Sequence, residues 1–319
     1  MGFGPARPAS FRRAHAILLR VARLIVNPNA SRVTPELVAA VEREIGGVET
    51  VLTRGQGHAT DLAAEAEPGE PLYVLSGDGG FNEVVNGLPD GVPVAFLPGG
   101  GTSVLPRALG LPRDAVAAAH ALAQGAAGRT ISLGHVEASL EGEPVADRRF
   151  TFSAGIGLDA ELVRAVDRLG RRAGGRRPGD VVFARELGRL LLAHRAGFGP
   201  ALTVVGRGRA AFALVANCDP YSYAGRVPLH AAPEATFEGG LDLAAPVELT
   251  AARIPAAALA LVRPRPGRPR WLLRVHDADE LRIECDRPLP LQVDGEDLGD
   301  VTAATFHAER AALEALVAR

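Results

Sequence analysis

The hydrophobic positions of this chain follow different patterns in its two halves. Over residues 22–132, short apolar runs alternate with alanine-rich segments whose apolar side chains recur every three or four positions. Such runs are typical of buried strands, and the second spacing is typical of amphipathic helices. Their alternation predicts a parallel sheet covered by helices on both faces. We expect strands at residues 22–27, 72–75 and 92–97, and helices at residues 35–45, 58–66, 81–88 and 115–124.

After Ser132 the chain changes to short segments in which apolar and polar side chains alternate. A period of two predicts antiparallel strands with one buried face. One helical stretch is expected in this half, over residues 180–196. The pattern therefore predicts an α/β domain followed by a β-rich domain. The strands of the second domain are expected at residues 149–152, 201–205, 212–216, 281–284 and 289–293.

Two glycine-rich loops follow expected strands of the first domain and precede expected helices. The first loop spans residues 76–80 and the second spans residues 98–102. Glycine accepts positive φ and lets backbone N–H groups converge, and a helix N-terminus adds a partial positive charge. Ligands usually bind at the carboxyl ends of the strands of an open α/β sheet. The two loops together therefore predict a phosphate-binding site at this edge.

The basic residues exclude several common classes of nucleotide-binding protein. All 35 residues counted as lysine or arginine are arginines. A Walker A loop, a protein kinase and a pyridoxal enzyme each require a lysine. A dinucleotide-binding fingerprint would need a third glycine where Asn82 stands.

Asp78 lies inside the first loop and predicts that a cation accompanies the phosphate. A carboxylate repels phosphate unless a cation lies between them, and Mg²⁺ held by carboxylates and substrate phosphates is the usual arrangement. The alternative interpretation of residues 77–79 is an ordinary tight turn, because Asp and Gly are favoured turn residues. Repetition of the loop after a second apolar strand favours the phosphate site.

Six motifs extend this pattern from the first expected strand to the end of the chain. They comprise residues 27–31, Thr53 with residues 57–59, and residues 76–88, 98–112, 152–160 and 293–296. Their order and spacing resemble the diacylglycerol kinase catalytic domain. That family includes bacterial lipid kinases and the sphingosine and ceramide kinases. It shares the plan of its nucleotide domain with NAD kinases and phosphofructokinases.

The chain departs from the family's usual motifs in both loops. The usual first loop is Gly-Gly-Asp-Gly-Thr, whereas this chain has Ser76 at the first position and Gly80 at the last. The serine resembles sphingosine-type members. In the second loop, Ser103 replaces an asparagine and Val104 replaces an aspartate, and the valine resembles one branch of bacterial members.

The resemblance implies an α/β nucleotide-binding domain of the NAD kinase and diacylglycerol kinase type, followed by an antiparallel β-sandwich domain for the lipid. It also implies that the closing segment returns to the first domain. The expected divisions are an N-terminal extension at residues 1–20, the nucleotide domain at 21–132, the lipid domain at 133–290 and the closing segment at 291–319.

The resemblance further implies ATP-dependent transfer of the γ-phosphoryl group to the hydroxyl of a membrane lipid such as diacylglycerol, with Mg²⁺, as a step of phospholipid metabolism. It places Asp294 and Glu296 at the active cleft, and we favour Glu296 as the base with Asp294 beside it. The two carboxylates share one face if the segment is extended, but the Asp-Gly pair equally suits a turn. The expected catalytic residues are Glu296, Asp294 and Asp78, with Asp78 as the metal ligand. The expected nucleotide contacts are Asn27, Thr53, Gly77, Asp78, Gly79, Gly80, Asn82, Glu83, Gly100, Gly101 and Thr102.

Other functions remain open at this point. A degenerate family member that binds nucleotide or lipid without turnover is the main alternative, motivated by Gly80 and Ser103. An NAD kinase and a sphingoid-base kinase are further alternatives. The motifs through Asp294 and Glu296 argue against the NAD kinase.

Composition and charge add expectations about partners and location. The formal net charge is −2 and aromatic residues make up 5% of the chain, so we expect no nucleic-acid partner. Two cysteines are too few for a disulfide framework. Residues 161–209 contain 11 arginines and four acidic residues, with five of these arginines between Arg168 and Arg177. Such a stretch favours peripheral contact with an anionic membrane, and its alternative is a solvated loop. We expect a cytoplasmic, peripherally membrane-associated protein, for which a homodimer is compatible with the sequence.

Overall fold

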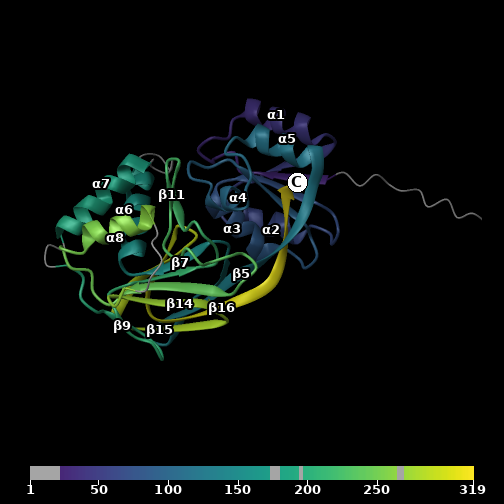
Figure 1. Cartoon of the computed structure of the whole chain (residues 1–319). Helices are drawn as coiled ribbons and strands as arrows, with labels where there is room; N and C mark the ends of the chain where they lie inside the picture. The colour runs from purple at the N-terminus through teal and green to yellow at the C-terminus, as the bar shows by residue number, and fades with distance from the viewer. Residues whose placement is uncertain (1–21, 173–179, 194–196, 264–268) are drawn as a thin grey trace, which may run out of the picture.

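A single large sheet runs through the whole molecule. The computed structural model describes residues 22–172, 180–193, 197–263 and 269–319 (Figure 1). The expected N-terminal extension, residues 1–20, lies outside the described residues. The described strands form one sheet of 14 strands and a separate two-stranded hairpin. The large sheet is parallel in the first half of the chain and mostly antiparallel in the second.

The first half is an α/β domain. Its parallel strands lie in the order β4-β3-β1-β2. The strands are β1 (Ala22–Val26), β2 (Val48–Leu52), β3 (Leu72–Ser76) and β4 (Val94–Pro98). The helices are α1 (Pro35–Ile45), α2 (His58–Ala64), α3 (Asp78–Gly87), α4 (Val104–Ala108) and α5 (Ala115–Gly125).

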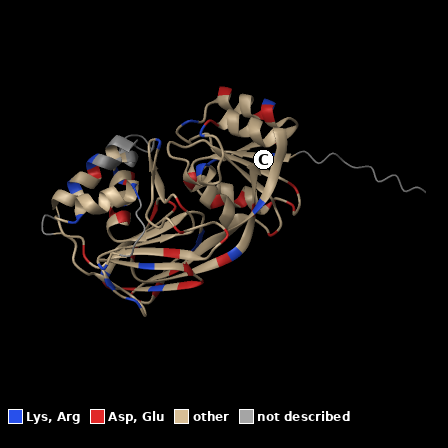
Figure 2. Ribbon diagram, viewed as in Figure 1, with Lys and Arg blue, Asp and Glu red and all other residues tan. Residues whose placement is uncertain are grey.

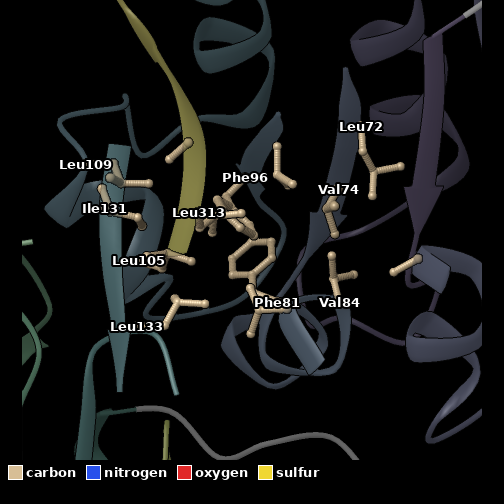
Figure 3. Packing of buried hydrophobic residues seen from close by; sticks show 14 of the residues in the cluster. Leu72, Val74, Phe81, Val84, Phe96, Leu105, Leu109, Ile131, Leu133 and Leu313 are labelled. Atoms are coloured by element: carbon tan, nitrogen blue, oxygen red, sulfur yellow. The ribbon is translucent and has the colours of Figure 1, made fainter. Parts of the chain in front are cut away.

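Helices cover both faces of this parallel sheet. On one face α2 packs against α3, and Phe81 of α3 meets Phe96 of β4 edge to face with ring centroids 5.3 Å apart (Figure 3). On the other face α1 packs against α5, and Val41 and Ala118 belong to a second buried cluster. The predicted α/β architecture is therefore confirmed.

Local sequence signals explain why α1 was predictable to the residue. The side chain of Thr34 accepts a hydrogen bond from the backbone N–H of Leu37, and Pro35 follows as the first helical residue. Gly46 ends the helix with a φ of 71°, in the left-handed region that glycine adopts without strain. The cap, the proline and the glycine together fix both ends of the helix.

The second half is rich in antiparallel strands. It contains α6 (Leu158–Arg172), α7 (Asp180–Ala193) and α8 (Ile254–Val262). Its strands are β5 (Ala126–Leu140), β6 (Glu143–Phe150), β7 (Ser153–Ile156), β8 (Leu202–Val204), β9 (Gly208–Ala210), β10 (Ala213–Ala216), β11 (Ser222–Ala224), β12 (Val227–Leu229), β13 (Leu241–Pro246), β14 (Leu272–Ala278), β15 (Glu280–Val293) and β16 (Glu296–Ala318).

Two long strands, β5 and β16, connect the two halves of the molecule. They pair with each other in antiparallel fashion over most of their length. Near its end, β16 also pairs in parallel with β4, where Ala315 lies opposite Val94. The closing segment thus joins the sheet of the first domain. The expected boundary after residue 132 falls inside β5, so this strand belongs to both halves.

The second half differs from the prediction in its helices and in one strand. One helix was expected there, whereas the described residues contain three. Helix α8 was missed because it is apolar on all sides and carries no helical periodicity, and α6 was missed although it is amphipathic. The strand expected at residues 149–152 is interrupted between β6 and β7. The backbone N–H groups of Thr151 and Phe152 donate to the carboxylate of Asp294 at this point, which removes them from the ladder.

None of the described helices combines the length and the apolar character that a bilayer crossing requires.

Candidate active site

A cavity of about 620 Å³ opens at the carboxyl ends of the parallel strands. This volume lies in the range of small-molecule sites, and the position is the usual one for ligands of an open α/β sheet. Most of the residues expected from the sequence line it. Those that do are Asn27, Thr53, Gly77, Asp78, Gly79, Gly80, Glu83, Gly100, Gly101, Thr102 and Glu296. Asn82 and Asp294 do not line the cavity.

The two glycine loops lie against each other at the floor of the cavity. A Cβ atom added to Gly100 would lie 2.9 Å from the Cα of Gly77, closer than real side chains approach backbone. The backbone N–H of Gly99 donates to the carbonyl of Ser76 over 2.7 Å, which fixes the second loop to the end of β3. Glycine is required here because the two backbones touch.

Asp78 is the first residue of α3 rather than the tip of a loop. Gly77 is the N-cap of this helix, so Gly79 and Gly80 lie within its first turn. The side chain of Asp78 is buried, and its Oδ1 accepts a hydrogen bond from the backbone N–H of Leu105 over 3.3 Å. This contact joins the start of α3 to the start of α4.

Glu296 reaches the cavity from the turn between β15 and β16. Asp294 and Gly295 form a two-residue hairpin with φ values of 46° and 78°, which is the signature of a type I′ turn. Of the two conformations that the sequence left open for this Asp-Gly pair, extended or turn, the structure contains the turn. A Cβ atom added to Gly79 would lie 2.5 Å from Oε1 of Glu296, so the carboxylate rests on the first turn of α3.

Arg148 of β6 holds the other side of the Glu296 carboxylate. Its Nη2 lies 3.0 Å from Oε2 of Glu296, and its Nε donates to Oδ1 of Asn82 over 2.5 Å. Arg148 was not expected from the sequence. Nothing in an alternating strand distinguishes an arginine that pairs with a distant carboxylate from one that faces solvent.

Asp294 is completely buried behind the cavity wall. Its carboxylate accepts hydrogen bonds from the side chains of Asn82 (2.8 Å) and Thr151 (2.9 Å) and from three backbone N–H groups. Burial raises the pKa of Asp294, and the backbone hydrogen bonds from Phe152, Thr151 and Ser153 together with that from Asn82 oppose the rise. Five donors around one carboxyl group match an ionised acceptor, so we take this carboxylate to be charged.

Asn82 is also buried and links α3 to the second half of the molecule. Its side-chain N–H group donates to Asp294 and to the carbonyl of Arg149 over 2.9 Å. Asn82 was expected to contact the nucleotide directly. The structure instead places it one layer behind the lining, between Asp294 and Arg148.

The remaining polar residues of the lining are anchored locally. Asn27 Oδ1 accepts from the backbone N–H of Asn29 over 3.0 Å, which closes the turn after β1. Thr53 is buried and donates its backbone N–H to the carbonyl of Val26 over 2.8 Å. Glu83 Oε2 accepts from the backbone N–H of Ala59 over 3.3 Å and thereby supports the start of α2.

The second loop is closed by a serine where the family has asparagine. Ser103 has a φ of 48°, a left-handed conformation in which asparagine is far more frequent than serine. Its hydroxyl accepts from the backbone N–H of Gly100 over 3.2 Å and donates to the carbonyl of Gly100 over 3.1 Å. The serine hydroxyl therefore takes part in shaping the loop.

A buried polar network supports the turn that carries Glu296. Gln292 Oε1 accepts from the backbone N–H of Gly295 over 2.8 Å, and its Nε2 donates to Asp159 over 2.7 Å. Burial raises the pKa of Asp159, and hydrogen bonds from Tyr221 and Gln292 oppose the rise. A Cβ atom added to Gly155 would lie 2.4 Å from the Asp159 carboxylate, so glycine makes room for this network. Sequence patterning gave no signal for Gln292, because a glutamine in a strand usually faces solvent.

The charges of the lining favour a metal-bound polyphosphate. Among the described lining residues, Asp78, Glu83 and Glu296 are acidic and Arg32 is basic. This excess of carboxylates would repel a free polyphosphate but suits one that carries Mg²⁺, which prefers carboxylate and phosphate oxygens. Asp78 belongs to the first turn of α3 and Glu296 lies against that turn, so the site offers carboxylate oxygens, the ligand type that this cation prefers.

Known proteins are similar to this chain within its first half. Residues 21–136 match the profile of the diacylglycerol kinase catalytic domain. The diacylglycerol kinases of Bacillus subtilis (strain 168) and Staphylococcus carnosus (strain TM300) are 38% identical over 129 residues and 33% identical over 114 residues. These matches cover 37% and 33% of this chain and 42% and 37% of the relatives, so they span about two fifths of the relatives' length.

The fold is similar over both halves to a solved structure. The crystal structure of a diacylglycerol kinase from Bacillus anthracis str. Sterne superposes with a TM-score of 0.62 at 19% identity, covering 93% of this chain and 96% of that chain. The arrangement of an α/β domain and a β-rich domain is therefore shared. Residues 21–136, which contain both glycine loops, are therefore similar to the diacylglycerol kinase catalytic domain.

Proposed function

We propose that this protein is an ATP-dependent lipid kinase that transfers the γ-phosphoryl group to a lipid hydroxyl, with diacylglycerol as the acceptor to test first. The observation that carries the proposal is the contact of Glu296 with the first turn of α3, beside Asp78 and both glycine loops. The match of residues 21–136 to a kinase catalytic domain supports it. So do curated relatives that bear the name diacylglycerol kinase.

In the proposed mechanism, each part of the cavity has one task. The glycine loops bind the phosphates through backbone N–H groups at the starts of α3 and α4. Asp78, with Glu296 nearby, would hold Mg²⁺, which neutralises charge on the phosphates when bound. The lipid hydroxyl attacks the γ-phosphorus, the bond from that phosphorus to the bridging oxygen of ADP breaks, and Glu296 accepts the hydroxyl proton. In a loose transition state this proton moves late, so position matters more than base strength.

Asp294 and Asn82 act as positioning residues in this proposal. Both are buried, and neither lines the cavity. Asp294 fixes the turn from which Glu296 extends, and Asn82 ties that turn to α3 through a 2.8 Å hydrogen bond. Asp294 was expected as a catalytic residue beside the base Glu296, and in this proposal it orients that base.

The proposal includes peripheral contact with an anionic membrane through α7 and α8. All nine residues of α8 are apolar and none is buried. On α7, the side chains of Arg185 and Arg189 are 69% and 80% exposed, and Leu192 is also exposed. Figure 2 shows basic residues along this group of helices. Exposed leucines beside exposed arginines suit an anionic lipid surface.

Of the five arginines between Arg168 and Arg177, only Arg168 has a side chain that the structure describes. Arg168 is an exposed residue of α6. Arg176 and Arg177 lie outside the described residues, as do the side chains of Arg171 and Arg172.

The test is a phosphoryl-transfer assay with a choice of acceptors. The purified protein is incubated with Mg²⁺, γ-labelled ATP and mixed vesicles containing diacylglycerol, and the lipids are then extracted and separated. We expect label in phosphatidic acid and little label with Glu296→Gln. Parallel reactions with a sphingoid base and with NAD test the two other kinase readings. Binding of ATP without labelling of any acceptor would favour the degenerate member.

A further inference from the structure

The hydroxyl of Ser76 is buried in the wall of the cavity without a partner. Ser76 ends β3, is 2% exposed and lines the cavity. Among the described residues, its Oγ has no hydrogen-bond partner. A buried hydroxyl normally finds a partner, and one at a binding site without a partner points to a ligand that completes it.

Gly80 is the residue that gives this hydroxyl its space. A Cβ atom added to Gly80 would lie 2.0 Å from Oγ and 2.9 Å from Cβ of Ser76. The side chain of Asn27 lies beside the same point, with Nδ2 at 3.8 Å. Any side chain at position 80 would therefore have to displace the Ser76 side chain.

The family's usual loop has the same two residue types in the opposite order, with glycine first and threonine last. Here the hydroxyl-bearing residue is Ser76 and the glycine is Gly80. We infer that the two positions have exchanged roles: Ser76 Oγ occupies the space of the missing threonine side chain and donates a hydrogen bond to a phosphate oxygen of the bound nucleotide. The identity of the nucleotide rests on the proposed function. The steric relation between Ser76 and Gly80 does not depend on that function.

This exchange changes the meaning of Gly80 in the chain. Taken alone, the loss of a threonine from the phosphate loop suggests a weakened site. With Ser76 in the same space, the loop retains one hydroxyl beside Asn27 and the start of α3. Gly80 is then a consequence of Ser76 and carries no argument for a degenerate member.

A set of variants tests the inference through two separate measurements. The first is the affinity for ATP with Mg²⁺, measured by calorimetry, and the second is the unfolding temperature without nucleotide. Ser76→Ala should weaken ATP binding about tenfold, the scale of one hydrogen bond to a charged group, without lowering the unfolding temperature. Gly80→Thr should lower both, because its Cβ meets Ser76. Ser76→Gly combined with Gly80→Thr should restore ATP affinity to within about threefold of the wild type. The threonine then supplies the hydroxyl, and the glycine leaves room for it.

Ser132→Ala is the matched control for these variants. The Ser132 hydroxyl is likewise buried and without a partner among the described residues, but Ser132 does not line the cavity. Its replacement should leave ATP affinity unchanged. An equal loss of affinity in Ser76→Ala and Ser132→Ala would show a general effect of the fold and overturn the ligand role.

Two further outcomes would overturn the inference. ATP binding by Ser76→Ala as tight as that of the wild type would exclude the hydroxyl as a ligand. Equal impairment of Gly80→Thr with and without Ser76→Gly would exclude the exchange of roles. Failure of the proposed function is distinguishable, because a wild-type protein that binds ATP but labels no lipid would leave both parts of this inference standing. A wild type that binds no ATP would overturn the ligand role, while the unfolding temperatures would still decide the exchange.

Discussion

Glu296 is held between two fixed partners, and this makes its chemical role testable apart from its structural one. One carboxylate oxygen rests on Gly79 and the other lies 3.0 Å from Arg148. Glu296→Gln keeps the size of the side chain but cannot accept the lipid proton. We expect turnover to fall about 10²-fold or more, the scale of general-base catalysis, with ATP affinity nearly unchanged. Initial rates over a range of ATP concentrations measure both quantities.

Glu143→Gln is the control for this variant, because Glu143 is an exposed residue at the start of β6. It should have wild-type kinetics. If Glu296→Gln raised the KM for ATP and left kcat unchanged, Glu296 would be a nucleotide contact and the proton would go elsewhere.

Asp78 has a structural contact as well as its proposed metal, and two substitutions separate them. Asn at position 78 retains an oxygen that can accept from Leu105, whereas Ala does not. We expect Asp78→Asn to lose Mg²⁺-dependent transfer and to keep the wild-type unfolding temperature. Asp78→Ala should lose both, because the link between α3 and α4 is broken. Activity titrated against Mg²⁺ and thermal unfolding are the measurements, and Asp78→Asn with turnover within about threefold of the wild type would contradict the metal role.

At the scale of single residues, most residues that line the cavity were predicted from the sequence, but residues that hold the lining in place from behind were missed. The glycines of the two loops were predictable because backbone contact leaves few alternatives to glycine. Arg148 and Gln292 were not, since their partners lie far away along the chain, in Glu296 and Asp159. A polar residue in a strand carries no mark of such a partner until the strand pairing is known.

Helix α3 and the β15–β16 turn act as one unit because Asn82 and Asp294 join them. Five groups donate hydrogen bonds to the Asp294 carboxylate. Asp294→Asn would turn an amide N–H group toward one of these donors. We expect a loss of about 1–3 kcal/mol in the free energy of unfolding, the cost of unpaired buried polar groups. Denaturant unfolding measures this loss, and lipid kinase turnover should fall with it.

Glu296→Gln should differ from Asp294→Asn in stability. It should keep the wild-type free energy of unfolding while losing turnover. Wild-type stability in Asp294→Asn, together with a severe loss of kcat, would make Asp294 the catalytic carboxylate and reverse the two roles.

At the scale of elements, prediction succeeded where capping and periodicity were both present. Helix α1 has both, with Thr34 at its start and Gly46 at its end. Helix α8 has neither signal, because its residues are apolar on every side and no side chain caps its start. The start of α3 was placed too late, since glycines at its first turn read as loop although Gly77 already serves as N-cap.

At the scale of the molecule, β16 ties the position of Glu296 to the glycine loops. This strand begins at Glu296, pairs with β5 along most of its length and ends beside β4, which leads into the second loop. A change in the relation of the two halves would therefore move the proposed base relative to the phosphates. Hydrophobic patterning could not predict this continuity, because it reports which face of a strand is buried and not which strand lies next to it.

The proposed membrane surface can be tested on exposed residues of α7 and α8. Leu259 and Val262 on α8 are each 43% exposed, and Arg185 and Arg189 project from α7. We expect binding to vesicles with anionic headgroups, and little binding to neutral ones. Binding should weaken as salt rises past about 0.15 M, where the Debye length is ~8 Å. Co-sedimentation with vesicles measures it.

Substitutions of the apolar residues and of the basic residues of this surface should weaken vesicle binding in different ways. Leu259→Glu with Val262→Glu should abolish vesicle binding at every salt concentration, whereas Arg185→Gln with Arg189→Gln should remove the part that salt weakens. Neither pair should alter the rate with a short-chain acceptor in detergent, because both lie outside the cavity lining. The controls are Val145→Glu on β6 and Arg282→Gln on β15, which are exposed in other elements. If the controls reduced vesicle binding as much as the α7 and α8 variants, net charge alone would govern attachment and these helices would have no special role.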